Sequence, residues 1–371
     1  MVKRGENIYK RKDGRWEGRY RKARNQNGRI IYGYIYGKKY SEVREKLSQK
    51  RTTVLDEPST VYDGTISDWL DYWLSTAVRV RVKPSTWTNY ESKSRNHIRP
   101  YLGKKKLSSI ERKDIIAFIQ QLSALRYSEN TIKNILTILK SMFNYALDYE
   151  YISGNPCSNI SISARKAKKV RALSIDTQRR LEALSFQERE CSAVIIGLAT
   201  GMRIGEISAL RWEDIDFYRE VITVQRTLQR IPDLENTKKT KIIISSPKTS
   251  SSQRDIPLPK YLKEYLLSKK RLASSEYVIS ANGSFAEPRV INYRLKKLLE
   301  TAEMEVFSFH VLRHTFATRC VESGVDVSSL SKLLGHTSTK LTLDTYTDSM
   351  WEKRKEAMTL MDQKQFIERI N

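Results

Sequence analysis

The sequence predicts a multidomain α+β protein: a small three-stranded sheet with a helix, then a helical bundle, then a mainly α-helical domain that contains a small antiparallel sheet. The 371 residues correspond to two or three domains, at roughly 100 to 200 residues each. Hydrophobic residues make up 39% of the chain, which is enough to bury several cores. Their spacing changes from a period of two near the N-terminus to a helical period further on, so the class of structure changes along the chain.

The first domain is expected over residues 1–55. Aromatic and β-branched residues alternate with polar ones over 8–12, 16–22 and 30–36, and the turn signals Asp13-Gly14 and Asn27-Gly28 separate these runs. A helix is expected to begin at Ser41. The sequence therefore predicts three strands followed by one helix.

This first domain is strongly basic. Its first fifty residues hold 16 Lys and Arg against five Asp and Glu, whereas the whole chain has 67 against 42 and a net charge of +25. A charge of this size favours a polyanionic partner, with nucleic acid ahead of an acidic membrane surface. We expect the sheet to contact DNA through Arg19, Arg21, Tyr32 and Tyr34, and the alternative is a solvated basic face without a partner.

A helical bundle of four or five helices is expected over residues 62–160. Ile66, Trp69, Leu70 and Trp73 recur at helical spacing, and a second apolar stripe runs through 132–143. Between these stripes, a helix is expected to begin at Pro84 and another to cover 114–122.

A basic linker, residues 161–172, and a third domain, residues 173–371, complete the chain. The linker concentrates positive side chains that we expect to follow a phosphate backbone, namely Arg165, Lys166, Lys168 and Lys169. In the third domain, helical stripes flank strand-like runs at 221–228 and 241–245, and a helical region is expected over about 290–369.

Several classes of protein are disfavoured. No run approaches the roughly 18 apolar residues of a membrane helix, and no apolar signal core follows the basic N-terminal residues, so we expect a cytoplasmic protein without a membrane partner. The three cysteines are few, odd in number and far apart, which disfavours a disulfide framework and a zinc site.

Candidate reactive residues gather in the third domain. His310 and Arg313 are three residues apart, so on a helix both project from one face. Arg203 is expected at a turn between two helices, because Gly201 interrupts an apolar helical run and Gly205 is expected to precede a new one. Taken singly, each residue is more often structural, because a helical histidine usually packs and an arginine near a helix end is usually a surface charge.

The combination of motifs resembles the tyrosine recombinase (phage integrase) family. Arg203 in TGMRIGE, His310-x-x-Arg313, His336 in LGH, and Tyr346 ten residues later follow the order of that family over residues 173–350. Lys248, in the turn of SSPKTSSSQRDIPL, resembles the family's hairpin lysine. The bundle resembles the core-binding domain, and the basic sheet resembles the arm-binding domain of integrases from conjugative transposons and related phages.

The resemblance implies a role for each of six residues. Tyr346 is the nucleophile, Arg203 and Arg313 hold the scissile phosphate, Lys248 is the general acid, and His310 and His336 complete the site. A tyrosine hydroxyl with an ordinary pKa of about 10 needs a base or a positive environment, and His310 can accept its proton. Two arginines can neutralise the transition state without Mg²⁺, so no cofactor and no metal is expected.

The activity implied is that of a site-specific DNA integrase, which cleaves and rejoins strands through a 3′-phosphotyrosine and thereby integrates and excises a mobile element. Its implied partners are double-stranded DNA at core and arm sites and three further copies of the chain, forming a tetramer on paired sites. An apolar stripe after Tyr346, formed by Met350, Ala357, Leu360, Met361 and Phe366, is expected to link the copies, and the alternative is that this helix folds back on its own domain. An excisionase or a host DNA-bending protein stays open as a further partner, and the enzyme is expected on the bacterial nucleoid when it binds DNA.

Two other functions compete with the integrase. A type IB topoisomerase uses the same chemistry without exchanging strands, but relaxation needs no second DNA site, so the arm-like domain favours the integrase. A non-catalytic DNA-binding regulator of the same fold would be expected to lack part of the constellation, and all six positions are filled.

Overall fold

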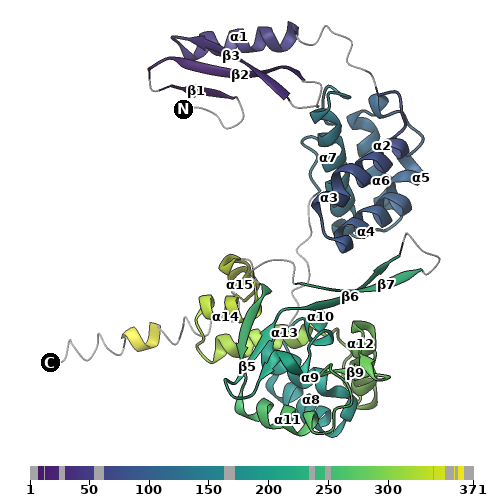
Figure 1. Ribbon diagram of the computed structural model, residues 1–371, viewed down its shortest axis with the longest axis vertical. Helices are drawn as coiled ribbons and strands as arrows, with labels where there is room; N and C mark the ends of the chain where they lie inside the picture. Colours follow the sequence, from purple (N-terminus) through teal and green to yellow (C-terminus); the bar gives the residue numbers. More distant parts are fainter. Residues whose placement is uncertain are drawn as a thin grey trace, which may run out of the picture. The chain divides into compact units, whose positions relative to one another are not determined.

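A computed structural model describes residues 7–11, 13–24, 30–53, 62–162, 172–233, 239–246, 252–336, 338–346, 355 and 358–362. The chain divides into two compact units, Met1–Lys166 and Ala167–Asn371, and Figure 1 labels their elements. Helices and small antiparallel sheets make up both units, which confirms the predicted fold class. None of the helices in the described ranges combines the length and apolar character that a membrane crossing demands.

The N-terminal sheet consists of β1 (Ile8–Lys10), β2 (Trp16–Arg24) and β3 (Ile30–Gly37), paired antiparallel in the order β1-β2-β3. Helix α1 (Tyr40–Thr53) lies across one face of the sheet (Figure 1). Val43 and Leu47 of this helix form a small core with Ile8. Gly18 lies directly beneath both helix side chains, where a Cβ atom would collide with them. The three strands and the helix agree with the sequence prediction.

The helical bundle has six α-helices in the described range 62–162. They are α2 (Ile66–Trp73), α3 (Arg79–Arg81), α4 (Pro84–Lys93), α5 (Arg99–Leu102), α6 (Arg112–Ala124) and α7 (Glu129–Asp148). The π-helical turns Leu74–Val78 and Ser94–Ile98 join α2 to α3 and α4 to α5 without a break. Both predicted apolar stripes are buried in one core, where Trp69 also donates a hydrogen bond to the carbonyl of Met142 at 3.3 Å.

The second unit is mainly helical. Its α-helices are α8 (Ile175–Gln187), α9 (Ser192–Thr200), α10 (Ile204–Ser208), α11 (Lys260–Lys270), α12 (Pro288–Thr301), α13 (His310–Glu322), α14 (Val327–Leu334) and α15 (Thr339–Tyr346). Helix α9 is buried along its whole length, because its nine residues contain no charged side chain. It packs against α8, α10, α11 and α13, and so forms the centre of the unit.

Small antiparallel sheets flank these helices. Strands β4 (Ile215–Asp216), β5 (Val221–Val224) and β8 (Arg254–Pro257) form one sheet, and β9 (Ser280–Ala281) pairs with β10 (Ser284–Phe285). Strands β6 (Thr227–Pro232) and β7 (Thr240–Ser245) form a hairpin (Figure 1). The single strand predicted over 221–228 is wrong, since β5 and β6 belong to different sheets. Gln225 and Arg226 interrupt it because both bond to the buried carboxylate of Asp214, at 2.6 and 2.7 Å.

Candidate active site

Arg203 lies between two helices, as predicted. Helix α9 ends at Gly201, whose φ of +63° is a left-handed conformation that suits glycine, and Arg203 is the residue before the first turn of α10. Gly205 lies inside α10 and not before it, so that part of the prediction is wrong. The Arg203 guanidinium donates to Glu206 Oε1 at 2.8 Å and to the carbonyl of Gly335 at 3.1 Å, and its side chain is 40% exposed.

Arg313 is buried and bonded to backbone at two places. It lies in the first turn of α13, three residues after His310, which begins that helix. Its Nη1 donates to the carbonyl of Gly201 and its Nη2 to the carbonyl of Leu334, both at 2.7 Å. The guanidinium therefore joins the end of α9 to the end of α14 and is held in one orientation.

The C-terminal end of α14 is the point where the site comes together. The last carbonyls of a helix have no partner within the helix, and this end of the helix dipole favours cations. Leu333, Leu334 and Gly335 each accept a hydrogen bond from a different arginine, namely Arg254, Arg313 and Arg203, at 2.6, 2.7 and 3.1 Å. Gly335 ends the helix with a φ of +63°, and His336 follows it directly.

His336 is fixed by the next helix. Its Nδ1 lies 2.8 Å from the hydroxyl oxygen of Thr342, a residue of α15 that is 1% exposed. His310 contacts a third histidine, since its ring centre lies 4.8 Å from that of His314 in an edge-to-face arrangement. The structure thus gathers His310 and His314 on α13 and places His336 at the end of α14.

All three histidines are shifted toward the neutral form. Burial, with the charges of Arg313 and Arg203, lowers the pKa of His336 to about 4 and also lowers the pKa of His310. Burial, with His310 and Arg313, lowers the pKa of His314 to about 4. Near pH 7 these imidazoles are uncharged, so each can accept a proton, while the positive charge of the site comes from the arginines.

Tyr346 is the last residue of α15, one helical turn after Thr342. The side chain of Tyr346 and the whole of Lys248 lie outside the described residues.

Glu206 and Arg254 belong to the site and were not predicted. The Glu206 side chain is 3% exposed, and Arg254 binds both of its oxygens, at 2.8 and 3.2 Å. Burial raises the pKa of Glu206, but the hydrogen bond and charge of Arg254, with the charge of Arg203, outweigh burial and lower it. Glu206 is the third helical residue after Arg203, a spacing at which a glutamate often caps the start of a helix. This spacing is the signal in the sequence for its contact with Arg203. Nothing in the sequence pairs it with Arg254.

The predicted DNA-contact residues of the N-terminal sheet are only partly described. Arg19 lies opposite Tyr34 in the pairing of β2 with β3, and Tyr34 is 50% exposed. Their strand positions alternate with Gly18 and Ile35, which face α1, so this pair lies on the face away from the helix. The backbone pairs Arg21 with Tyr32, but the side chains of both lie outside the described residues, as do Arg165, Lys166, Lys168 and Lys169.

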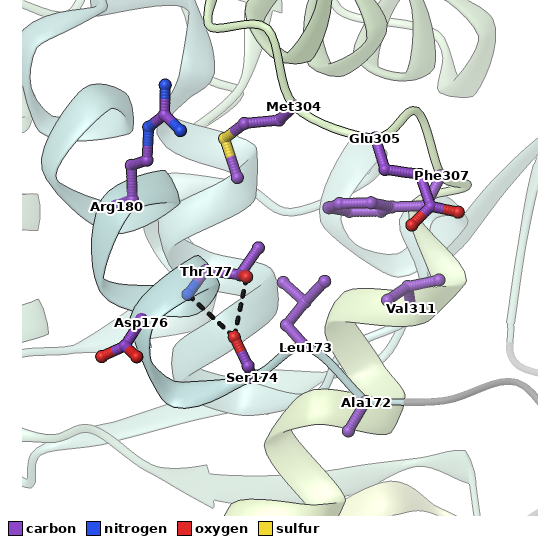
Figure 2. Close-up of a pocket in the computed structure, with 10 residues that line it drawn as sticks. All are labelled: Ala172, Leu173, Ser174, Asp176, Thr177, Arg180, Met304, Glu305, Phe307 and Val311. Atoms are coloured by element: carbon purple, nitrogen blue, oxygen red, sulfur yellow. Dashed lines mark hydrogen bonds between the residues drawn. The ribbon is translucent and has the colours of Figure 1, made fainter.

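A pocket of about 770 Å³ lies at the start of the second unit. Figure 2 shows apolar residues of its lining, among them Leu173, Phe307 and Val311, together with the charged residues Arg180 and Asp176. None of the four candidate residues whose side chains the structure describes, Arg203, His310, Arg313 and His336, lines it. We therefore assign the reactive site to the end of α14 and not to this pocket.

Comparisons with known proteins place this arrangement in a family. A model of the phage integrase family matches residues 173–353, and a model of the phage integrase N-terminal SAM-like domain matches residues 65–123. The two matches together cover well over half of the chain. A XerC-like tyrosine recombinase of Caldanaerobacter subterraneus subsp. tengcongensis is 28% identical over 366 residues, which span 92% of this chain and 94% of that protein.

Solved structures share the fold. The Tn1549 transposon integrase (residues 82–397 of that protein, with a Tyr-to-Phe substitution), in complex with transposon right end DNA, has a TM-score of 0.67 at 22% identity, covering 79% of this chain and 99% of that one. A lambda integrase tetramer bound to a Holliday junction has a TM-score of 0.57 at 19% identity, covering 90% of this chain and 96% of that one. The order of the motifs, their convergence at the end of α14 and these matches lead to one conclusion: the chain belongs to the phage integrase family and is a tyrosine recombinase.

Proposed function

We propose that this tyrosine recombinase integrates and excises a mobile DNA element of the conjugative transposon or phage type, with Tyr346 as its nucleophile. The observation that carries the proposal is that Arg313 and Arg203 bind the carbonyls of Leu334 and Gly335, the two residues directly before His336. The likeness to the Tn1549 transposon integrase supports the type of element.

In the proposed reaction, the arginines hold the scissile phosphate. A guanidinium carries five N–H donors in a planar fork, and the backbone bonds of Arg313 use two of them to fix its plane. Arg203 is fixed by Glu206 and Gly335 and is still 40% exposed, which lets it reach a phosphate at the surface. Preorganised donors of this kind stabilise charge that develops on the nonbridging oxygens.

The histidines supply neutral hydrogen-bonding groups. His310 accepts the proton of the attacking tyrosine, a role that its lowered pKa supports because a neutral imidazole has an open nitrogen. Nδ1 of His336 and the Thr342 hydroxyl oxygen lie 2.8 Å apart, and we assign the hydroxyl as the donor of this contact. With that assignment the proton of the neutral ring is on Nε2, from which it can be donated to the phosphate.

Tyr346 and Lys248 complete the proposed reaction. The Tyr346 oxygen attacks the phosphorus, the bond to the 5′ oxygen breaks, and Lys248 protonates the departing oxygen. The products are a 3′-phosphotyrosine and a 5′-hydroxyl. A 5′-hydroxyl from a second duplex then attacks the phosphotyrosine, which rejoins the strands without ATP because the covalent link preserves the energy of the phosphodiester.

We propose four parts with separate tasks: residues 1–55 bind arm sites, residues 62–160 bind core sites, residues 161–172 follow the DNA backbone, and residues 173–371 carry out the chemistry. The outer face of the N-terminal sheet supports the first assignment, since it exposes Tyr9, Tyr34 and Tyr36 and places Arg11 over the ring of Tyr36 at 5.4 Å. Aromatic and cationic side chains together suit a nucleic-acid surface.

The proposed active assembly is a tetramer of this chain on two duplexes. The DNA-bound tetramer of lambda integrase supports it, as do the exposed apolar side chains Met358, Leu360 and Met361 in the short described segment beyond α15. Whether an excisionase or a host DNA-bending protein takes part is left to experiment. Because its substrate is bacterial DNA, we place the reaction in the cytoplasm, with the enzyme on the nucleoid.

The experiment is covalent trapping on a nicked suicide substrate, which releases the 5′ end after cleavage. The parent should form a protein–DNA adduct that resists denaturation, and Tyr346→Phe should bind DNA within a few fold of the parent without forming an adduct. Tyr218→Phe is the matched control, since Tyr218 is 96% exposed in a turn of the same unit. An adduct that persists in Tyr346→Phe would refute the assignment.

A further inference from the structure

Arg254 is a buried arginine that the proposed reaction does not use. Its side chain is 5% exposed and lies on β8. Its Nε donates to the carbonyl of Leu333 at 2.6 Å, Nη2 to Glu206 Oε2 at 2.8 Å, and Nη1 to Glu206 Oε1 at 3.2 Å and to the carbonyl of Ser252 at 3.1 Å. Since Nε, Nη1 and Nη2 of Arg254 all donate to protein acceptors, an effect of this residue on the reaction is expected to pass through these partners.

Glu206 connects Arg254 to the phosphate-binding arginine. The same two carboxylate oxygens that receive Arg254 also receive Arg203: Oε1 accepts from Nη1 at 2.8 Å, and Oε2 accepts from the backbone N–H at 2.9 Å. A carboxylate buried to this degree stays ionised only beside a positive partner. Arg254, whose side chain is 5% exposed, provides that positive charge from the protein interior. Arg203, whose side chain is 40% exposed, contacts the carboxylate from the surface.

Arg254 also shares the end of α14 with the two phosphate-binding arginines. It donates a hydrogen bond to the carbonyl of Leu333. The next two carbonyls, those of Leu334 and Gly335, accept hydrogen bonds from Arg313 and Arg203. His336 follows these three residues directly. A displacement of Leu333 would therefore move the acceptors of both arginines and the backbone of His336 together.

We propose that Arg254 is a positioning residue of the recombination site: it keeps Glu206 charged and fixes the end of α14, and so holds Arg203, Arg313 and His336 in the geometry that binds the scissile phosphate. The proposal rests on the reaction proposed above. Lysine cannot replace Arg254. The planar guanidinium binds both oxygens of Glu206 and the Leu333 carbonyl at once, whereas the lysine ammonium is a single point at the end of a flexible side chain. A misplacement of about 1 Å at a reacting centre can cost on the order of a hundredfold in rate.

The test compares Arg254→Lys with Arg319→Lys. Arg319 is a matched control because it also binds a carboxylate, a side-chain oxygen and a backbone carbonyl, those of Glu322, Gln178 and Leu173, but does so away from α14. Covalent adduct formation is measured in a single turnover with enzyme in excess, as a rate per bound complex, so that the result does not depend on the folded fraction. We expect Arg254→Lys to lose roughly 30- to 100-fold in rate with unchanged DNA affinity, and Arg319→Lys to stay within about threefold of the parent.

A double-mutant cycle with Arg203→Lys separates positioning from general structural damage. If Arg254 acts through Arg203, the double variant should be only a few fold slower than Arg203→Lys alone, whereas independent losses would multiply. Multiplying losses, or equal rates in Arg254→Lys and Arg319→Lys, would overturn the proposal. Arg254→Gln serves as a second variant, and loss of DNA binding in both Arg254 variants would assign the residue to the fold and would also overturn it. If the parent itself forms no adduct, the proposed function fails instead.

Discussion

Acid should destabilise the second unit because His314 and His336 are held neutral. The pKa of each is lowered to about 4 from an ordinary value of 6.5. Between these two values the unfolded chain binds protons that the folded chain does not, so stability is full above pH 6.5 and falls as the pH decreases toward 4.

The size of this effect follows from the same pKa values. Lowering the pH from 7.5 to 5 should cost about 2 kcal/mol per histidine by linkage, or about 1 to 2 kcal/mol once the partial exposure of the rings is allowed for. Two histidines then cost roughly 2 to 4 kcal/mol, which for a unit of this size lowers the unfolding midpoint by roughly 5 to 15 °C.

The assay is thermal unfolding of the parent and of the His314→Asn/His336→Gln double variant at several pH values between 5 and 7.5. The parent should lose stability with acid more steeply than the variant, so the two midpoints should converge or cross as the pH falls. Equal pH slopes would refute the claim that these rings are neutral in the folded protein. A step in the cleavage rate of the parent with a midpoint near 6.5 would contradict it as well, because it would show an ordinary histidine titrating in the site.

Three further predictions concern particular segments. In thermal unfolding, Gly201→Ala should destabilise the protein by about 2 to 4 kcal/mol, because alanine is strained at a φ of +63° and its Cβ would collide with Phe316. The control is Gly283→Ala, where φ is also positive but no atom lies near the added Cβ, and this variant should cost only about 1 to 2 kcal/mol. Deleting residues 1–55 should leave cleavage of core sites intact and abolish binding to separate arm sites in footprinting, and full arm affinity in the truncated protein would exclude this role for the sheet. Removing residues 352–371 should leave binding to a single site intact while reducing paired complexes and recombination, and sedimentation showing normal tetramers at normal yield would rule out an assembly role for the tail.

The fold could be predicted wherever a local pattern decided it. The alternating residues of β2 and β3 and the apolar stripe of α7 each specify one buried face, and all three elements form as expected. The single strand expected over 221–228 failed for a non-local reason, since Asp214, which binds Gln225 and Arg226, lies 11 and 12 residues away and in a different element. Periodicity contains no information about such a contact.

In the candidate site too, the sequence predicts the residues that stand in local motifs and not those that depend on distant contacts. Arg203, Arg313 and His336 could be proposed as site residues because each stands in a short motif, and the structure brings them to one helix end. Glu206 and Arg254 were missed because they are 48 residues apart and their ion pair exists only after β8 packs beside α14 and brings Arg254 to the Glu206 carboxylate. The carbonyl acceptors of the three arginines are backbone atoms, whose role depends on where a helix ends and not on which side chains it carries.

The central claim is that Tyr346 forms the covalent bond to DNA. The most direct measurement is mass spectrometry of the peptide that stays attached to a suicide substrate after the trapped complex is digested with a protease and a nuclease. We predict a single modified peptide whose phosphonucleotide mass lies on Tyr346, at the 3′ side of the cleaved strand. Attachment to another residue, or a 5′ linkage, would contradict the account.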